Sequence, residues 1–187
     1  MTQRIFAWIT PNQLTVGRIS AIPLLLLLIY VDRPWWNVVG CALFALACLT
    51  DYWDGELARS RGQITQLGKL LDPLADKMLT TALLVMLAAM DRAQVLPVIV
   101  IILREFAVSG LRQVAALEGV AIAAVRGAKW KTLLQMIATG ILLLHANPLH
   151  VPLLLAGNSV LWLAMVWTLV TGYGYFQRYY SSATPKD

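Results

Sequence analysis

Six long stretches of the chain are apolar, and short breaks that carry proline, glycine and charge separate them. They cover about 14–31, 35–49, 70–90, 95–117, 133–144 and 151–175. A transmembrane helix needs roughly 20 mostly apolar residues. Only 13% of the 187 residues are charged, against about 25% in a typical soluble domain. The pattern therefore predicts an all-α polytopic membrane protein with six transmembrane helices, built as a single membrane domain over residues 1–187.

The distribution of lysine and arginine predicts the orientation in the membrane. An even number of helices puts both termini on one side, and basic residues gather in short cytoplasmic loops. One side would carry only Arg33 and Arg92, and the other would carry nine basic residues: Arg4, Arg59, Arg61, Lys69, Arg126, Lys129, Lys131, Arg178 and Lys186. We therefore expect both termini on the cytoplasmic side of the membrane. Residues 1–10 have the composition of a short interfacial helix, and a frayed polar start fits them equally.

Four aspartates lie at the cytoplasmic ends of the second and third predicted helices. Asp51 and Asp54 are three residues apart, and Asp72 and Asp76 are four apart, so each pair shares one helix face. Four carboxylates at the rim of a membrane repel one another strongly unless a cation neutralises them. Oxygen ligands without a nearby histidine or thiolate favour Mg²⁺ or Mn²⁺. Two ions about 3.5 to 4 Å apart would form a clamp for phosphoryl chemistry.

Small and basic residues accompany these carboxylates. Gly55 follows Asp54 directly, and Gly68 lies four positions before Asp72, so the backbone can approach a ligand closely at both places. Arg59 offers a planar pair of donors suited to a phosphate oxygen. The arrangement suits a diphosphate bound beside two metal ions.

The same residues form one pattern: Asp51-x-x-Asp54-Gly55-x-x-Ala58-Arg59, eight residues, then Gly68-x-x-x-Asp72-x-x-x-Asp76. It resembles in full the signature of the CDP-alcohol phosphatidyltransferase family. Members of that family are six-helix membrane enzymes, usually homodimers, in which an alcohol displaces CMP from a CDP-linked lipid. The resemblance implies that Asp51 and Asp72 bridge two metal ions and that Asp54 completes one site. Asp76 would complete the other site and take the proton of the alcohol.

The resemblance also implies a binding site for CDP-diacylglycerol. Its contacts would come from the stretch 11–18, which looks like the family's usual N-terminal segment, and from the residues after Asp54. The implied contacts are Asn12, Thr15, Arg18, Gly55, Arg59, Thr65 and Gly68.

Basic residues later in the chain predict an acceptor that carries its own phosphate. Arg104, Glu105 and Arg112 lie within the fourth apolar stretch and share a helix face, and charges inside a membrane belong in a cavity. Three more basic residues follow at the cytoplasmic mouth of the fifth helix, although positive-inside topology alone would also explain them. The expected acceptor-phosphate contacts are Arg104, Arg112, Arg126, Lys129 and Lys131.

Two of these segments resemble the branch of the family whose acceptor is sn-glycerol 3-phosphate. They are 104–112 and 129–132. The implied reaction converts CDP-diacylglycerol and sn-glycerol 3-phosphate into phosphatidylglycerol phosphate and CMP. Ala128 departs from the pattern, because that branch usually has glycine before Lys-x-Lys-Thr.

Alternative interpretations stay open from the sequence. The acceptor could be inositol phosphate, or another lipid in a cardiolipin-type synthesis. The four aspartates could be solvated acids at helix ends, or a transport site for divalent cations, although transporters usually bind their cargo near the bilayer midplane. We expect membrane lipids and a second copy of the chain as further partners, and no nucleic acid.

Overall fold

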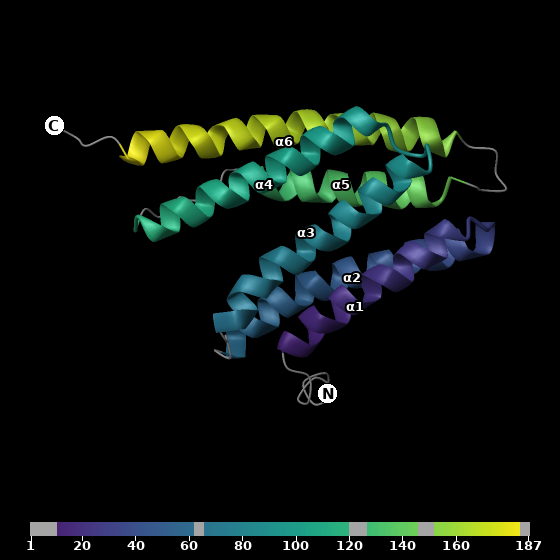
Figure 1. The fold of residues 1–187 in the computed structure, drawn as a ribbon, viewed down its shortest axis with the longest axis horizontal. Coiled ribbons are helices and arrows are strands. Elements are labelled where there is room, and N and C mark those ends of the chain that lie inside the picture. Colours follow the sequence, from purple (N-terminus) through teal and green to yellow (C-terminus); the bar gives the residue numbers. More distant parts are fainter. Residues whose placement is uncertain (1–10, 62–65, 120–126, 146–151, 184–187) are drawn as a thin grey trace. The chain divides into compact units, whose positions relative to one another are not determined.

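The computed structural model is all-helical over the residues it describes, which are 11–61, 66–119, 127–145 and 152–183 (Figure 1). Within these ranges the side chains of 11–16, 18, 50–61, 66–76, 128, 182 and 183 fall outside the description. The helices are α1 (Pro11–Tyr30), α2 (Pro34–Arg61), α3 (Gln66–Ala89), α4 (Val95–Leu117), α5 (Ala128–Leu143) and α6 (Leu153–Ala183). Each helix falls on one apolar stretch, so the all-α prediction is confirmed. The predicted interfacial helix at 1–10 lies outside the described residues.

One helix among the described residues is long and apolar enough to cross a bilayer. It is α6, over Leu153–Ser181, with a mean hydropathy of 1.9. Three shorter apolar segments accompany it, at Ile19–Tyr30, Pro34–Leu49 and Lys77–Ala89. The membrane-spanning character of the other helices stays a prediction.

The chain divides into two compact units, which are treated separately below. The first comprises Met1–Met86 with Ala146–Leu149, and the second comprises Leu87–His145 with His150–Asp187. Helices α1, α2 and most of α3 belong to the first unit, and α4, α5 and α6 belong to the second. The organisation of residues 1–187 as a single domain stays a prediction.

In the first unit, α1 and α2 pack against each other across a link of three residues. Asp32 in this link has a left-handed backbone with a φ of 49°, which Asp adopts more readily than most residues. The Asp32 carboxylate accepts a hydrogen bond of 3.3 Å from Nδ2 of Asn37, in the first turns of α2. The buried apolar side chains of the pair are Ile22, Leu25 and Ile29 of α1 and Phe44 of α2.

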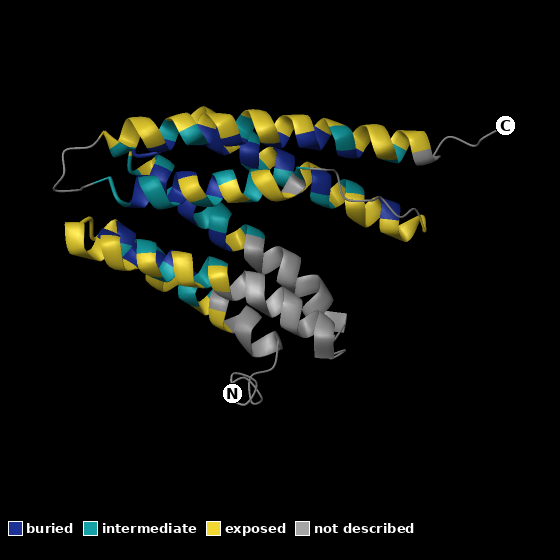
Figure 2. Ribbon diagram, turned by 180° about the vertical axis from the view of Figure 1, so that it is seen from behind, coloured by how far each residue is buried: buried dark blue, intermediate teal, exposed yellow. Residues whose placement is uncertain are grey.

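In the second unit, α6 packs against both α4 and α5. Its buried residues recur every three or four positions, as one helix face requires: Gly157, Leu161, Ala164, Thr168, Thr171, Gly172 and Tyr175. Exposed residues lie on the opposite side of the helix (Figure 2). Small residues let apolar helices approach closely. A Cβ atom added at Gly157 would lie 2.7 Å from Cγ and Cδ2 of the fully buried Leu142 in α5.

The side chain of Asn158 in α6 fixes the turn between α3 and α4. Its Oδ1 accepts a hydrogen bond of 2.8 Å from the backbone N–H of Gln94. Its Nδ2 donates to the carbonyl oxygen of Arg92 at 2.9 Å. Trp162, one turn further along α6, donates its indole N–H to the side-chain oxygen of Gln94. This turn includes Asp91, which has a φ of 57°, so α6 stabilises a connection with an uncommon backbone conformation.

We predict that Gly157→Ala destabilises the protein by about 1–3 kcal/mol, because the added methyl group overpacks the contact with Leu142. Gly110→Ala in α4 is the matched control, because no heavy atom lies within 4 Å of its added Cβ. The control should stabilise its helix by roughly 0.5–1 kcal/mol. Thermal unfolding of the purified proteins in detergent measures both effects. A melting temperature of Gly157→Ala at or above that of the wild type would contradict the close packing of α5 and α6.

Candidate active site

The backbone places the four predicted metal ligands on two consecutive helices of the first unit. Asp51 and Asp54 lie on α2, and Asp72 and Asp76 lie on α3. Helical backbone at all four positions supports the shared face expected for each pair. The donor set consists of carboxylates alone, which fits a hard cation such as Mg²⁺ or Mn²⁺.

The side chains of the aspartates fall outside the described part of the chain, and so do the predicted contacts to the CDP moiety: Asn12, Thr15, Arg18, Gly55, Arg59, Thr65 and Gly68. Among the side chains that are described, no three metal-ligating residues come together. The metal set and the CDP-binding set therefore stay predictions.

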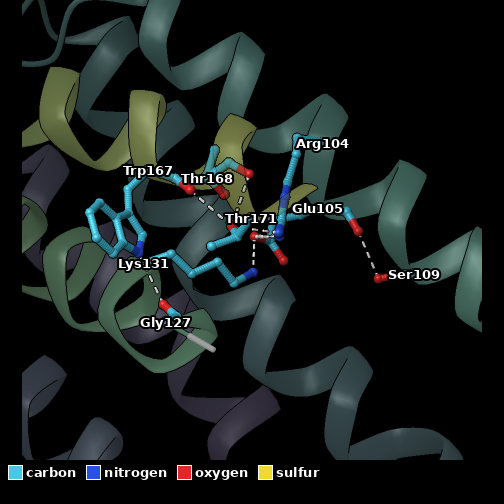
Figure 3. Close-up of polar contacts among 8 residues, drawn as sticks. All are labelled: Arg104, Glu105, Ser109, Gly127, Lys131, Trp167, Thr168 and Thr171. Atoms are coloured by element: carbon cyan, nitrogen blue, oxygen red, sulfur yellow. Dashed lines mark hydrogen bonds and ion pairs between the residues drawn. The ribbon is translucent and has the colours of Figure 1, made fainter. Parts of the chain in front are cut away.

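In the second unit the structure brings charged side chains from two helices together beside a third helix (Figure 3). Nη1 of Arg104 in α4 donates a hydrogen bond of 3.0 Å to Oε1 of the neighbouring Glu105. Nζ of Lys131 in α5 donates to the same carboxylate oxygen. Nη2 of Arg104 donates to Oγ1 of Thr171 in α6 at 2.9 Å. We call Arg104, Glu105, Lys131 and Thr171 the polar cluster.

The backbone of α6 provides the space in which Arg104 lies. A Cβ atom at Gly172 would lie 3.0 Å from Nε of Arg104, so a glycine leaves room for this side chain. The ring centroid of Tyr175 lies 6.0 Å from Cζ of the guanidinium, at the outer limit of a cation–π contact. Nε of Arg104 is buried without a hydrogen-bond partner. The guanidinium is therefore enclosed on the α6 side and engaged through both terminal nitrogens.

The polar cluster carries a formal net charge of +1, because one carboxylate serves two cations. Its charged side chains are 6% exposed at Arg104 and 14% exposed at both Glu105 and Lys131. Burying a charge is costly unless a partner compensates it, and ionisable residues among apolar helices usually mark a ligand or ion site. The cluster is therefore a candidate site for an anionic ligand.

The start of α5, which carries Lys131, is fixed by a contact with α6. Gly127 precedes α5 with a φ of 89°, a left-handed conformation that favours glycine. Its carbonyl oxygen accepts a hydrogen bond of 3.0 Å from the indole N–H of Trp167. A Cβ atom at Gly127 would lie 3.3 Å from Cζ2 of the same indole. Ala128, where the family pattern has glycine, is the first residue of the helix and directly follows Gly127.

The predicted acceptor contacts divide into three groups. Arg104 and Lys131 meet in the polar cluster, whereas Arg112 and Lys129 are exposed and Arg126 lies outside the described residues. The shared face predicted for Arg104 and Arg112 does not give them a shared environment. Eight helical residues rotate a side chain by about 80°, which is enough to separate a buried position from an exposed one. Arg112, Arg126 and Lys129 stay predicted contacts.

Two residues of the cluster have roles that the sequence did not predict. The sequence predicts that Glu105 is an intramembrane charge, but its bond to Lys131 joins positions 26 residues apart. Thr171 lies in an apolar stretch, where a threonine gives no signal of a partner on another helix.

Comparison with known proteins identifies the family of this chain. Residues 8–171 match the family model described as CDP-alcohol phosphatidyltransferase. A CDP-diacylglycerol–glycerol-3-phosphate 3-phosphatidyltransferase from Rickettsia bellii is 42% identical over 168 residues, covering 89% of this chain and 93% of the relative. One of the same name from Bacillus subtilis is 39% identical over 180 residues, covering 90% and 93%. The chain belongs to the CDP-alcohol phosphatidyltransferase family.

A solved structure confirms the fold. It is the crystal structure of a Mycobacterium tuberculosis phosphatidylinositol phosphate synthase with CDP-DAG bound. The TM-score is 0.72 at 18% sequence identity, and the alignment covers 100% of this chain and 94% of that chain. At this identity the likeness concerns the arrangement of the helices.

We predict that Thr171→Val destabilises the protein by about 1–3 kcal/mol, because it leaves Nη2 of the buried Arg104 without its acceptor. Thr168→Val is the matched control. Thr168 is equally buried in the same helix, and its hydroxyl has no hydrogen-bond partner, so its loss should be neutral or stabilising. Thermal unfolding in detergent compares the two variants. Equal melting temperatures would show that the bond to Arg104 contributes nothing to stability.

Proposed function

We propose that the protein transfers the phosphatidyl group of CDP-diacylglycerol to sn-glycerol 3-phosphate, giving phosphatidylglycerol phosphate and CMP. The observation that carries this proposal is the 42% identity, over 89% of the chain, to a relative named for that reaction. The polar cluster supports it, because a group of low exposure and net positive charge suits an acceptor that carries a phosphate.

The aspartates of α2 and α3 would hold two divalent ions, Mg²⁺ or Mn²⁺. Asp51 and Asp72 would bridge both ions, Asp54 would complete one site and Asp76 the other. When bound, the ions would neutralise charge on the diphosphate and on the departing CMP. The family match supports this assignment, and so does the purely carboxylate donor set on two helices.

Asp76 would also act on the acceptor. It would accept the proton of the glycerol 1-hydroxyl as that oxygen attacks the phosphorus on the lipid side. A new oxygen–phosphorus bond forms to the glycerol, and the bond from this phosphorus to the bridging oxygen of the diphosphate breaks. The bridging oxygen leaves with CMP. Fixing both substrates in this geometry turns a bimolecular encounter into an intramolecular step.

The remaining predicted residues would bind the two substrates. The CDP-diacylglycerol contacts would be Asn12, Thr15, Arg18, Gly55, Arg59, Thr65 and Gly68. The acceptor-phosphate contacts would be Arg104, Arg112, Arg126, Lys129 and Lys131. In the polar cluster Arg104 already bonds to Glu105 and Thr171 through both terminal nitrogens, so its contribution to the acceptor would be mainly electrostatic.

We further propose six transmembrane helices in a bacterial inner membrane, with residues 1–10 at the interface and both termini and the active site on the cytoplasmic side. The apolar α6 and the shorter apolar segments of α1, α2 and α3 support the spans, and the distribution of Lys and Arg supports the orientation. A homodimer surrounded by membrane lipids would be the working form. These features are consistent with the chain's membership of this enzyme family.

The direct test of the acceptor is CMP release from CDP-diacylglycerol with a panel of alcohols. We expect sn-glycerol 3-phosphate to be used well ahead of inositol phosphate, phosphatidylglycerol and free glycerol. A preference for inositol phosphate would overturn the acceptor and leave the family intact. A preference for phosphatidylglycerol as the acceptor would indicate a cardiolipin-type synthesis. Divalent-cation uptake by reconstituted vesicles, without CMP release, would favour the transport alternative.

We predict that Asp72→Asn lowers the rate of CMP release by at least about 100-fold, because a neutral amide replaces a charge that the ions need. EDTA should have the same effect on the wild type. Asp91→Asn is the matched control, because Asp91 is an exposed acid in the turn after α3 and asparagine tolerates its positive φ. CMP release by the three proteins is measured in detergent micelles. Full activity of Asp72→Asn, or of the wild type in EDTA, would contradict the metal site.

We predict that Arg112→Gln raises the KM for sn-glycerol 3-phosphate by about 10- to 100-fold, which corresponds to a charge-assisted contact of roughly 1.5–3 kcal/mol. The KM for CDP-diacylglycerol should stay within a few-fold of the wild type. Arg33→Gln, in the exposed link between α1 and α2, is the control and should change neither value. Equal weakening of both substrates would point to a structural role for Arg112.

A further inference from the structure

Glu105 links two cations that the acceptor would meet, although no step of the reaction uses its carboxylate. Its Oε1 accepts from Nη1 of Arg104 at 3.0 Å and from Nζ of Lys131. Glu105 and Arg104 are neighbours on α4, whereas Lys131 lies three residues past the start of α5. The shared oxygen therefore sets the place of the Lys131 ammonium relative to α4.

We propose that Glu105 is a positioning residue, which acts on the acceptor phosphate through Lys131. The proposal rests on the proposed function in one respect, namely that Lys131 contacts a phosphorylated acceptor. Glu105 itself does not touch the substrate. It holds the ammonium in one place, so that the acceptor does not have to order a flexible side chain when it binds.

The flexibility of lysine gives this bond its effect. A lysine side chain has four rotatable bonds, and fixing it in one conformation costs rotamer entropy. The bond to Glu105 orders the Lys131 side chain during folding, before the acceptor binds. Preorganisation of this kind increases the affinity for a ligand. The low exposure of Lys131 and Glu105, 14% for each side chain, reduces screening of the ion pair by solvent.

Glu105 can act in this way because it is itself held in place from α6. Arg104 binds its carboxylate, and the Thr171 hydroxyl binds Arg104. Gly172 leaves the space that the Arg104 side chain occupies. A continuous series of contacts thus runs from α6 through α4 to Lys131 in α5, all within the second unit.

Removal of the Glu105 charge has two effects of opposite sign on the acceptor. Loss of position weakens the contact between Lys131 and the phosphate. Loss of a negative charge makes the polar cluster more positive, which by Coulomb attraction would tighten phosphate binding. Positioning therefore predicts a higher KM for the acceptor in Glu105→Gln, and a purely electrostatic role predicts a lower one.

The experiment compares Glu105→Gln and Glu105→Asp as full-length proteins in detergent micelles. We expect Glu105→Gln to raise the KM for sn-glycerol 3-phosphate about tenfold, which is the effect of losing one charge-assisted contact. The kcat and the KM for CDP-diacylglycerol should stay within about threefold. Glu105→Asp, which keeps the charge but is one methylene shorter, should restore part of the loss. Glu118→Gln, an exposed acid just after α4 whose carboxylate accepts from Tyr179, is the control and should behave as the wild type.

A second variant tests whether Glu105 acts through Lys131. In a Lys131→Met background, Glu105→Gln should cause no further rise in the acceptor KM, because coupled residues are non-additive. Additive effects would overturn the proposal, and so would an unchanged or lowered KM in Glu105→Gln, or an equal rise in the KM of both substrates. If Glu105→Gln does not fold, the Glu105→Asp pair in the wild-type and Lys131→Met backgrounds decides the same question.

Failure of the proposed function would be visible separately, in the wild type. If the wild type prefers inositol phosphate to sn-glycerol 3-phosphate, the acceptor assignment is wrong. The same variants are then measured with inositol phosphate, and their KM values still support or overturn the positioning role of Glu105.

Discussion

A charged group among apolar helices needs a compensating partner, and this constraint determines how α4, α5 and α6 are joined. Arg104 is buried in α4, whose other buried residues are all apolar, and an unpaired guanidinium there would be very costly. Its partners come from its own helix, at Glu105, and from α6, at Thr171. Because Glu105 also binds Lys131 of α5, pairing one charge ties three helices together.

The same helix that satisfies Arg104 also provides the close packing of the second unit. Gly157 lets α5 approach α6 closely, and Gly172 leaves room for the arginine side chain. Trp167 fixes the carbonyl oxygen of Gly127 at the start of α5. Packing and polar pairing therefore use one face of α6. A change in its small residues is expected to alter the place of Lys131 as well as the stability of the fold.

The helices themselves could be predicted from the sequence, because apolar stretches of sufficient length have few other structures in a membrane. Their ends could not. The fifth apolar stretch begins at residue 133, yet α5 begins at Ala128, since Lys129 and Lys131 interrupt the apolar pattern without interrupting the helix. A long lysine side chain can cover apolar surface with its stem and keep its charge near a polar group. Apolar periodicity alone therefore does not predict that α5 begins before residue 133.

The helical backbone at the four aspartates could be predicted from the sequence, whereas the contacts between helices in the polar cluster could not. The spacing of Asp51 and Asp54 predicts that they share a helix face, because three residues are nearly one helical turn. Glu105 and Lys131 belong to different helices, and no spacing in the sequence relates them. For Arg104 and Arg112 the spacing predicts a contact environment that the structure does not show. It predicts a common helix face, but packing against α6 buries Arg104 and leaves Arg112 exposed.

The two cations of the polar cluster differ in ways that suit different tasks. A guanidinium is a rigid planar fork whose donors point in fixed directions, so it serves best where its partners are fixed too. Arg104 fits this description, with one terminal nitrogen on Glu105 and the other on Thr171. An ammonium is a compact charge with three rotating donors, and it adapts to ligands that arrive and leave. Arg104 therefore stabilises the arrangement of the helices, and Lys131, steadied by the carboxylate that both share, is the cation suited to meet a phosphate.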